Sequence, residues 1–164
     1  MKHLFLIMSL LFVTTATADI STKHLEKISD VLKYVESEHN PEALGDYNKQ
    51  GIPTSYGILQ IKQIVLDDVN KRYGTSYVHE EMFNINCAEE VFVLYIKMWS
   101  THLVSCAKRE VTEEDIVRIW NGGPHGYKKR ATIKYLEKYR ARKRKMTEPL
   151  NIYDFIPPLY LTTR

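Results

Sequence analysis

The 164-residue sequence has few of the features that mark a cofactor or metal protein. It has no glycine-rich phosphate loop, and its histidines show no ligand spacing with cysteines or acids. It has no internal repeat, and no second long apolar stretch follows the N-terminal one. We therefore expect no bound metal, no nucleotide and no other cofactor.

The first 18 residues have the pattern of a cleavable secretory signal peptide. A positively charged start is followed by the largely apolar residues 4–13 and by the small residues Ala16 and Ala18. The apolar run is shorter than the roughly 20 residues that a bilayer-spanning helix needs. We expect cleavage before Asp19 and a secreted or periplasmic protein.

Residues 19–145 suit a single domain, because domains commonly contain about 100–200 residues. After them, residues 146–164 carry three prolines and predict an extended C-terminal tail. We expect the domain to be a monomer.

The pattern of apolar residues predicts a mainly α domain with a small β element. Helical periodicity is found over residues 22–35, 61–73, 86–106, 112–121 and 127–142. Asn86 with Glu89, and Thr112 with Asp115, have the spacing of helix N-caps. Only residues 55–61 are expected to contribute strands.

The chain has only two cysteines, Cys87 and Cys106. At about 1.5 Å per residue, one helix over 86–106 would separate them by roughly 28 Å. A disulfide needs Cα atoms within about 7 Å. We therefore expect the two thiols to be unpaired with each other, although a secreted protein often pairs its cysteines.

Glu36 is the first candidate for catalysis. The helix over 22–35 has one apolar face, formed by Leu25, Ile28, Leu32 and Val35. Glu36 lies four residues beyond Leu32 and extends this face, whereas Glu38 falls on the opposite side. Desolvation raises the pKa of a carboxyl group, and a protonated acid can protonate a glycosidic oxygen. The alternative is an acid that only caps the helix or pairs with a basic residue.

Several short motifs occur in an order that resembles one family. They are Glu36-Ser37, Asn40-Pro41-Glu42-Ala43, Gly45-Asp46, Ser55-Tyr56-Gly57-Ile58-Leu59-Gln60-Ile61, Asn84 to Ala88, Trp120-Asn121-Gly122-Gly123 and Ala131-Thr132-Ile133-Lys134-Tyr135-Leu136. Together they resemble the soluble lytic transglycosylases and goose-type lysozymes, over roughly residues 25–139. The resemblance implies a lysozyme-like fold with the β element beside a substrate cleft.

The resemblance also implies a role for each matched residue. Glu36 matches the acid that protonates the glycosidic oxygen in peptidoglycan, between N-acetylmuramic acid and N-acetylglucosamine. The matched substrate-binding or orienting positions are Ser37, Gly57, Gln60, Asn121, Gly122 and Tyr135, with the Tyr135 hydroxyl contacting the acid and Gly57 and Gln60 forming the groove floor. Each glycine has the alternative of only meeting turn geometry. Trp120 is expected in the core, and Tyr56 suits either a sugar site or a core.

The chemistry after protonation is left open by the sequence. A lytic transglycosylase needs one acid and leaves a 1,6-anhydro end, whereas a hydrolase usually needs a second carboxylate. Asp46 matches an aspartate that positions water in goose-type lysozymes, but Lys62 stands where a further aspartate is expected. We therefore expect a transglycosylase, with a lysozyme-type hydrolase as the alternative and a non-catalytic wall-binding protein as a third possibility.

The positive charge is concentrated near the C-terminus. Residues 128–145 contain ten Lys or Arg and a single acid, Glu137. Such a face suits nucleic acid, anionic lipid or an acidic polymer such as an anionic wall polymer, and secretion makes nucleic acid the least favoured of these partners. The alternative is a solvated basic helix.

Overall fold

Five α-helices and a small sheet form the part of the chain, residues 20–148, that the computed structural model describes. The helices are α1 (Thr22–Ser37), α2 (Gln63–Tyr73), α3 (Ile85–Ala107), α4 (Glu113–Gly122) and α5 (Ile133–Thr147). Three short 3-10 helices are η1 (His79–Phe83), η2 (Gly126–Lys128) and η3 (Arg130–Thr132). The predicted class, mainly α with a small β element, is confirmed. The predicted signal peptide and residues 149–164 of the tail lie outside the described residues.

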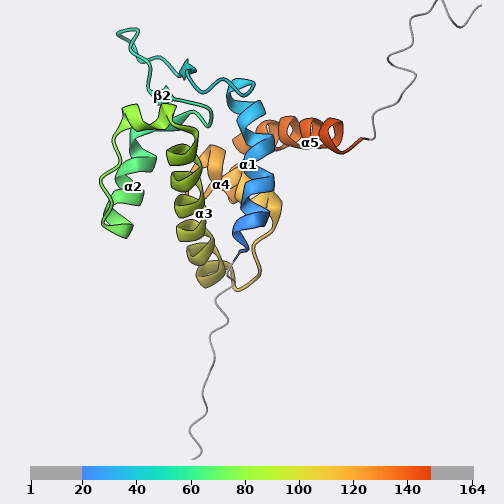
Figure 1. Ribbon diagram of the computed structural model, residues 1–164. Coiled ribbons are helices and arrows are strands. Elements are labelled where there is room, and N and C mark those ends of the chain that lie inside the picture. The colour runs from blue at the N-terminus through green and yellow to red at the C-terminus, as the bar shows by residue number, and fades with distance from the viewer. Residues whose placement is uncertain (1–19, 149–164) are drawn as a thin grey trace, which may run out of the picture.

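The helix α3 lies against α1, α2 and α4, and its apolar face supplies the centre of the core (Figure 1). Phe92 and Ile96 of α3 have no exposed surface, and neither do Leu25 and Leu32 of α1. Burying an apolar side chain of this size contributes about 1.5–3 kcal/mol. The core therefore fixes the C-terminal half of α1, on which Glu36 lies.

The sheet contains β1 (Leu44–Gly45), β2 (Ser55–Tyr56) and β3 (Ile61–Lys62), all antiparallel and in the order β1-β2-β3. Figure 1 shows this segment above the ends of α1 and α3. The strand β1 lies outside the segment predicted to form strands. Ile61 lay in both the predicted strand segment and the predicted helix, and it pairs with β2 as a strand residue. Lys62, predicted as helical, pairs with β2 as well, so α2 begins only at Gln63.

Helix ends follow local capping more closely than the apolar pattern. The helix α1 ends at Ser37, before Asn40-Pro41, because Glu38 adopts a left-handed conformation and its N–H bonds back to Tyr34. Asn84, not Asn86 as predicted, caps α3, and its side chain accepts from two backbone N–H groups. The predicted cap of α4, Thr112 with Asp115, is confirmed.

The basic helix begins six residues later than predicted, at Ile133 rather than Tyr127. Residues 126–132 form η2 and η3, which fold against α4. A Cβ on Gly126 would collide with the Arg118 carbonyl oxygen. The backbone at residue 126 therefore packs so closely against α4 that only glycine fits there. This approach turns α5 back across the end of α1.

The prediction of one unbroken helix between the cysteines is confirmed, since α3 runs from Ile85 to Ala107. Cys87 and Cys106 lie near its opposite ends and are both free. Among residues 20–148, no helix is both long and apolar enough to cross a membrane.

Candidate active site

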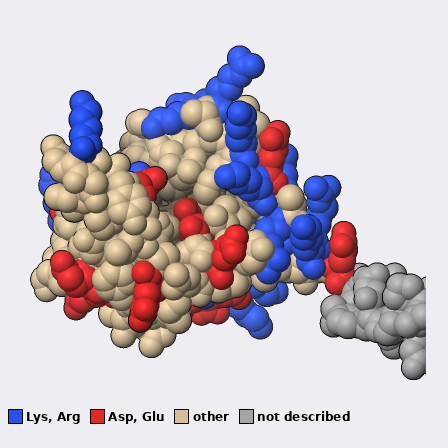
Figure 2. Space-filling view, turned by 90° about the horizontal axis from the view of Figure 1, so that it is seen from above, with Lys and Arg blue, Asp and Glu red and all other residues tan. Residues whose placement is uncertain are grey.

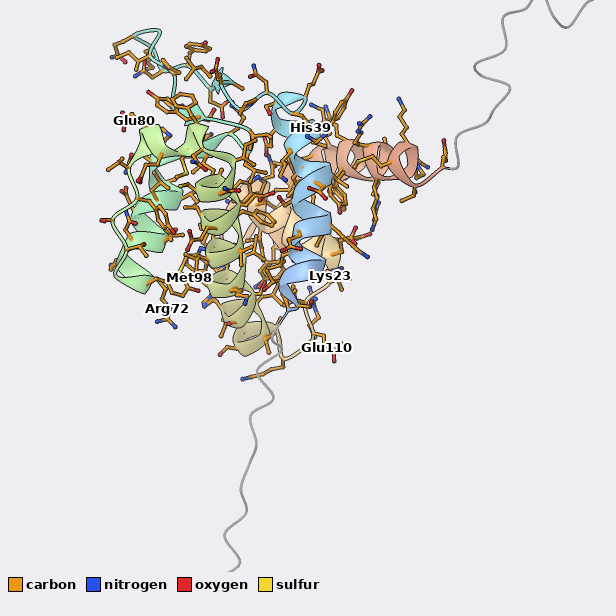
Figure 3. All side chains as sticks on the ribbon, viewed as in Figure 1. Lys23, His39, Arg72, Glu80, Met98 and Glu110 are labelled. Atoms are coloured by element: carbon orange, nitrogen blue, oxygen red, sulfur yellow. The ribbon has the colours of Figure 1, made fainter. Side chains whose placement is uncertain are left out.

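Three helices meet at the carboxyl group of Glu36. Glu36 is the penultimate residue of α1, and Figure 3 shows His39 just beyond the helix end beside the β segment, with Lys23 at the opposite end. Trp120 of α4 donates its Nε1–H to Glu36 Oε1 over 3.0 Å. Tyr135 of α5 donates its hydroxyl to the same oxygen over 2.5 Å. The predicted contact between Tyr135 and Glu36 is therefore present in the structure.

The two donors leave one carboxyl oxygen available. Both hydrogen bonds end on Oε1, and within the described part of the chain Oε2 accepts none. An oxygen that accepts two hydrogen bonds is the poorer place for the acid proton. A protonated Glu36 therefore carries its proton on Oε2, where it can be donated to a bound substrate.

Burial sets the protonation of Glu36. It raises the pKa of the carboxyl group from 4.5 to about 7, against the hydrogen bonds from Tyr135 and Trp120, which favour the charged form. Asp46 raises this pKa further, and Lys62 lowers it. Glu36 as a residue keeps intermediate exposure, so its carboxyl group is desolvated while part of the side chain stays accessible. Burial therefore keeps the Glu36 carboxyl group protonated to a higher pH than an exposed glutamic acid.

By contrast, Glu38 lies two residues further along the chain and is exposed. This difference confirms the prediction from helical periodicity that only one of the two carboxylates faces the interior.

A cleft of about 160 Å³ opens beside Glu36. Its lining residues come from α1, α2, α3, α4, the sheet and the loops that flank them: Glu36, Asp46, Gln60, Lys62, Ile64, Val65, Tyr95, Trp120, Asn121 and Gly123. The structure thus brings Glu36 together with three residues predicted for the site, Asp46, Gln60 and Asn121.

Asp46 and Lys62 form an ion pair at this cleft, with 2.7 Å between Oδ2 and Nζ. Both side chains are at least half exposed, so the pair contributes little to stability. Its charges nevertheless act on Glu36 with opposite signs. Lys62 was predicted only as a departure from the family pattern, and the structure makes it the partner of the candidate second carboxylate.

Gln60 lines the cleft, and its side chain is held by three hydrogen bonds. Its Nε2 donates to the carbonyl oxygens of Ala43 and Gly57, and its Oε1 accepts from the Ser55 hydroxyl. These bonds join the sheet to the loop before it, and they support Gln60 in a left-handed backbone conformation with φ of 50°.

One matched glycine, Gly57, faces protein rather than the cleft. Gly57 has φ of 76°, and a Cβ there would collide with the Met82 carbonyl oxygen of η1. Its missing side chain makes room for protein backbone rather than for a sugar ring, which corrects the prediction. Gly122, which the resemblance places in the turn beside Asn121, packs against the segment that leads into α5, since a Cβ there would meet the Thr132 methyl group. Gly123, the next residue, lines the cleft instead.

Ser37 and Tyr56 also act in the fold. The Ser37 hydroxyl donates to the Ile58 carbonyl oxygen over 2.8 Å, so it ties α1 to the sheet segment and makes no bond to Glu36. The Tyr56 ring stacks on His79 with centroids 3.8 Å apart and does not line the cleft. The implied role of Ser37 in orienting the acid or the substrate therefore stays a prediction, and the long-range bond of its hydroxyl is to the sheet segment.

Sequence reasoning missed the Trp120 hydrogen bond. Trp120 is 9% exposed, as its place on the apolar face of α4 predicts. Its indole N–H reaches an acid 84 residues earlier in the chain, a contact that no local pattern contains. The sequence did hold one indication of this bond. A buried tryptophan normally needs a hydrogen-bond acceptor for its N–H, and Trp120 was expected in the core.

Within residues 20–148, no group of three or more His, Cys, Asp or Glu side chains is arranged to hold a metal ion. Comparison with known proteins adds no assignment, since neither a family model nor a curated protein matches the chain.

Proposed function

We propose that the protein cleaves the β-1,4 bond between N-acetylmuramic acid and N-acetylglucosamine in peptidoglycan. The observation that carries this proposal is the Glu36 carboxyl group, buried at the edge of a cleft with a pKa of about 7 and one oxygen free. A general acid works best when its pKa lies near the working pH. The choice of peptidoglycan comes from the order of the sequence motifs.

In the first step, Glu36 Oε2–H protonates the glycosidic oxygen, and the bond from this oxygen to C1 of muramic acid breaks. Tyr135 and Trp120 stabilise the carboxylate that remains, because both donate to Oε1. In the second step, the C6 hydroxyl of the same sugar attacks C1, and Glu36 takes up its proton. The products are a free N-acetylglucosamine end and a 1,6-anhydromuramic acid end.

Transglycosylation is favoured over hydrolysis because the second carboxylate is already engaged. Asp46 is paired with Lys62 and largely exposed, which is a poor setting for a group that must deprotonate water. Intramolecular attack by a hydroxyl of the substrate needs no such base. One observation favours the hydrolase alternative, namely that Asp46 lines the same cleft as Glu36.

Mass spectrometry of the products from purified peptidoglycan tests the proposal. The anhydro product is lighter than the hydrolysis product by one water. We expect anhydro products from the native protein, and none from Glu36→Gln, which keeps the size and the acceptor oxygen but has no proton to give. General acid catalysis contributes roughly 10²–10⁴-fold to a rate. Glu38→Gln is the matched control and should retain activity.

Three results would count against parts of this proposal. Full activity in a folded Glu36→Gln protein would remove the mechanism. Reducing ends as the sole product would favour the lysozyme-type hydrolase. Retention of the native protein on cell walls without any cleavage, in a gel containing walls, would favour a binding protein without turnover.

A further inference from the structure

A second hollow, of about 410 Å³, lies between the end of α1 and α5. Its charged lining residues are Glu36, Glu38, Lys138, Arg142 and Lys145. Among the described residues, Glu36 is the one that lines both this hollow and the cleft, so the two spaces lie on either side of this residue.

The sequence predicted that the basic residues of α5 form one face. In the structure they divide into two sets on different sides of the helix. On one side, Arg140 pairs with Glu114 and Lys143 with Glu113 of α4. A larger hollow of about 610 Å³ on that side is lined by these same paired groups. Two of its three cations are therefore paired, and its three acids, Glu113, Glu114 and Glu137, balance the charge of Arg140, Lys143 and Arg144.

On the other side, Lys138, Arg142 and Lys145 make no ion pair with any residue between 20 and 148. When Glu36 is protonated, these three cations face only one acid of the hollow, Glu38. Figure 2 shows the acids near the centre of the hollowed face and Lys and Arg gathered toward the side on which α5 lies. The charge of this hollow favours an anionic ligand.

Arg142 is held in place for such a ligand. Its guanidinium lies over the Tyr34 ring, 3.4 Å from the centroid. Its Nε is buried and has no hydrogen-bond partner within the described chain. A planar guanidinium fixed by stacking is suited to bind a carboxylate through two parallel N–H groups. Because Nε is buried, a ligand carboxylate would be bound through the two terminal nitrogens of the guanidinium.

We propose that Lys138, Arg142 and Lys145 form a subsite for the carboxylates of the peptide attached to muramic acid. This subsite rests on the glycan cleavage proposed above. The peptide is joined to the lactyl group of the sugar whose C1 reacts, so its carboxylates lie near the scissile bond. The hollow adjoins Glu36 and carries cations at this place. The subsite makes the enzyme selective for glycan strands that retain acidic peptides.

The test compares two soluble, uncross-linked glycan substrates, one with free peptide carboxylates and one with the same carboxylates amidated. For the native protein, we expect amidation to raise KM about tenfold, the size of one charge-assisted hydrogen bond, with little change in kcat. In Lys138→Gln/Arg142→Gln, KM should be high for both substrates. The matched control, Arg140→Gln/Arg144→Gln, removes the same charge from the other side of α5 and should behave like the native protein.

Three outcomes would overturn the subsite. The first is a KM in Lys138→Gln/Arg142→Gln that equals the native KM for each substrate. The second is a native protein with the same KM for both substrates. The third is a KM that rises by the same factor for both substrates in the variant, so that the variant still prefers free carboxylates. Because Arg142 stacks on Tyr34, the double variant Lys138→Gln/Lys145→Gln gives the same test with the stacking preserved. Stronger competition by a phosphate-containing polymer than by the free peptide would assign the hollow to wall polymer instead.

A binding measurement separates this proposal from the proposed function. Fluorescence anisotropy of labelled, peptide-bearing strands is measured with Glu36→Gln protein, which needs no turnover. Binding that is weakened about tenfold by the added Lys138→Gln/Arg142→Gln changes supports the subsite, even if the native protein cleaves nothing. Unchanged binding overturns it, even if cleavage by the native protein is confirmed.

Discussion

Glu36→Gln should make the protein more stable at neutral and alkaline pH. Burial raises the pKa of Glu36 in the folded protein from 4.5 to about 7. As pH rises between these values, the unfolded chain loses the proton first, so the free energy of unfolding of the native protein falls. The decrease is complete once the pH passes about 7. The amide that replaces the carboxyl group in the variant does not titrate and avoids this loss.

The rise in pKa corresponds to about 3 kcal/mol of stability lost by the native protein at pH 8 relative to pH 4. The replacement keeps both hydrogen bonds, because the carbonyl oxygen of the new amide can accept from Trp120 and Tyr135 as Oε1 does. The stability difference between variant and native protein should therefore increase with pH by nearly this full amount. In a domain of this size it amounts to roughly 10 °C in Tm at pH 8.

Urea unfolding at several pH values between 4 and 8 measures the difference directly. Glu38→Gln is the control and should follow the native protein, because Glu38 is exposed. A stability difference that does not change with pH, or one that shrinks as pH rises, would refute the claim that burial holds Glu36 protonated.

The remaining predictions concern the surroundings of the acid. Tyr135→Phe removes a hydrogen bond that lowers the pKa of Glu36, so the alkaline limb of kcat/KM against pH should move up by about one pH unit while kcat falls. A limb that stays in place or moves down would contradict this. Gly57→Ala should cost more than about 2 kcal/mol in urea unfolding, because a left-handed backbone and a backbone collision act together. Gly51→Ala, with the same left-handed backbone at φ of 77° and open space around it, should cost only about 1 kcal/mol, and equal costs would remove the collision argument.

Most helices and the place of Glu36 were predictable from the sequence because they depend on short-range patterns. The apolar spacing over residues 22–35 already placed Glu36 inside and Glu38 outside, and the structure agrees. The cap of α4 was equally local, since Thr112 and Asp115 lie three residues apart. The Tyr135 contact came from the motif order, not from spacing.

The features that the sequence did not predict depend on contacts between distant segments. The Trp120 hydrogen bond and the pairing of β1 with β2 form only when separate elements meet. The role of Gly57 depends on Met82, which lies in a 3-10 helix that periodicity did not reveal. Likewise, the division of the basic residues of α5 follows from α4 covering one of its sides.

Because Asp46 is paired with Lys62, the role of Asp46 has to be tested by measuring activity at more than one pH. Asp46 raises the pKa of Glu36 and Lys62 lowers it, so Asp46→Asn leaves the effect of the lysine unopposed. The pKa of Glu36 should then fall, and less of the acid is protonated at neutral pH. A slower reaction at pH 7 is therefore expected even if Asp46 never touches a water molecule.

Comparing kcat/KM at pH 5 and pH 7 separates the two roles of Asp46. If Asp46 acts only through its charge, the activity of Asp46→Asn should return to nearly the native value at pH 5, where Glu36 is protonated in both proteins. If Asp46 is the base of a hydrolase, the loss should persist at pH 5, since no other group replaces it. The transglycosylase mechanism requires recovery at low pH, and a loss that is the same at both values would contradict it.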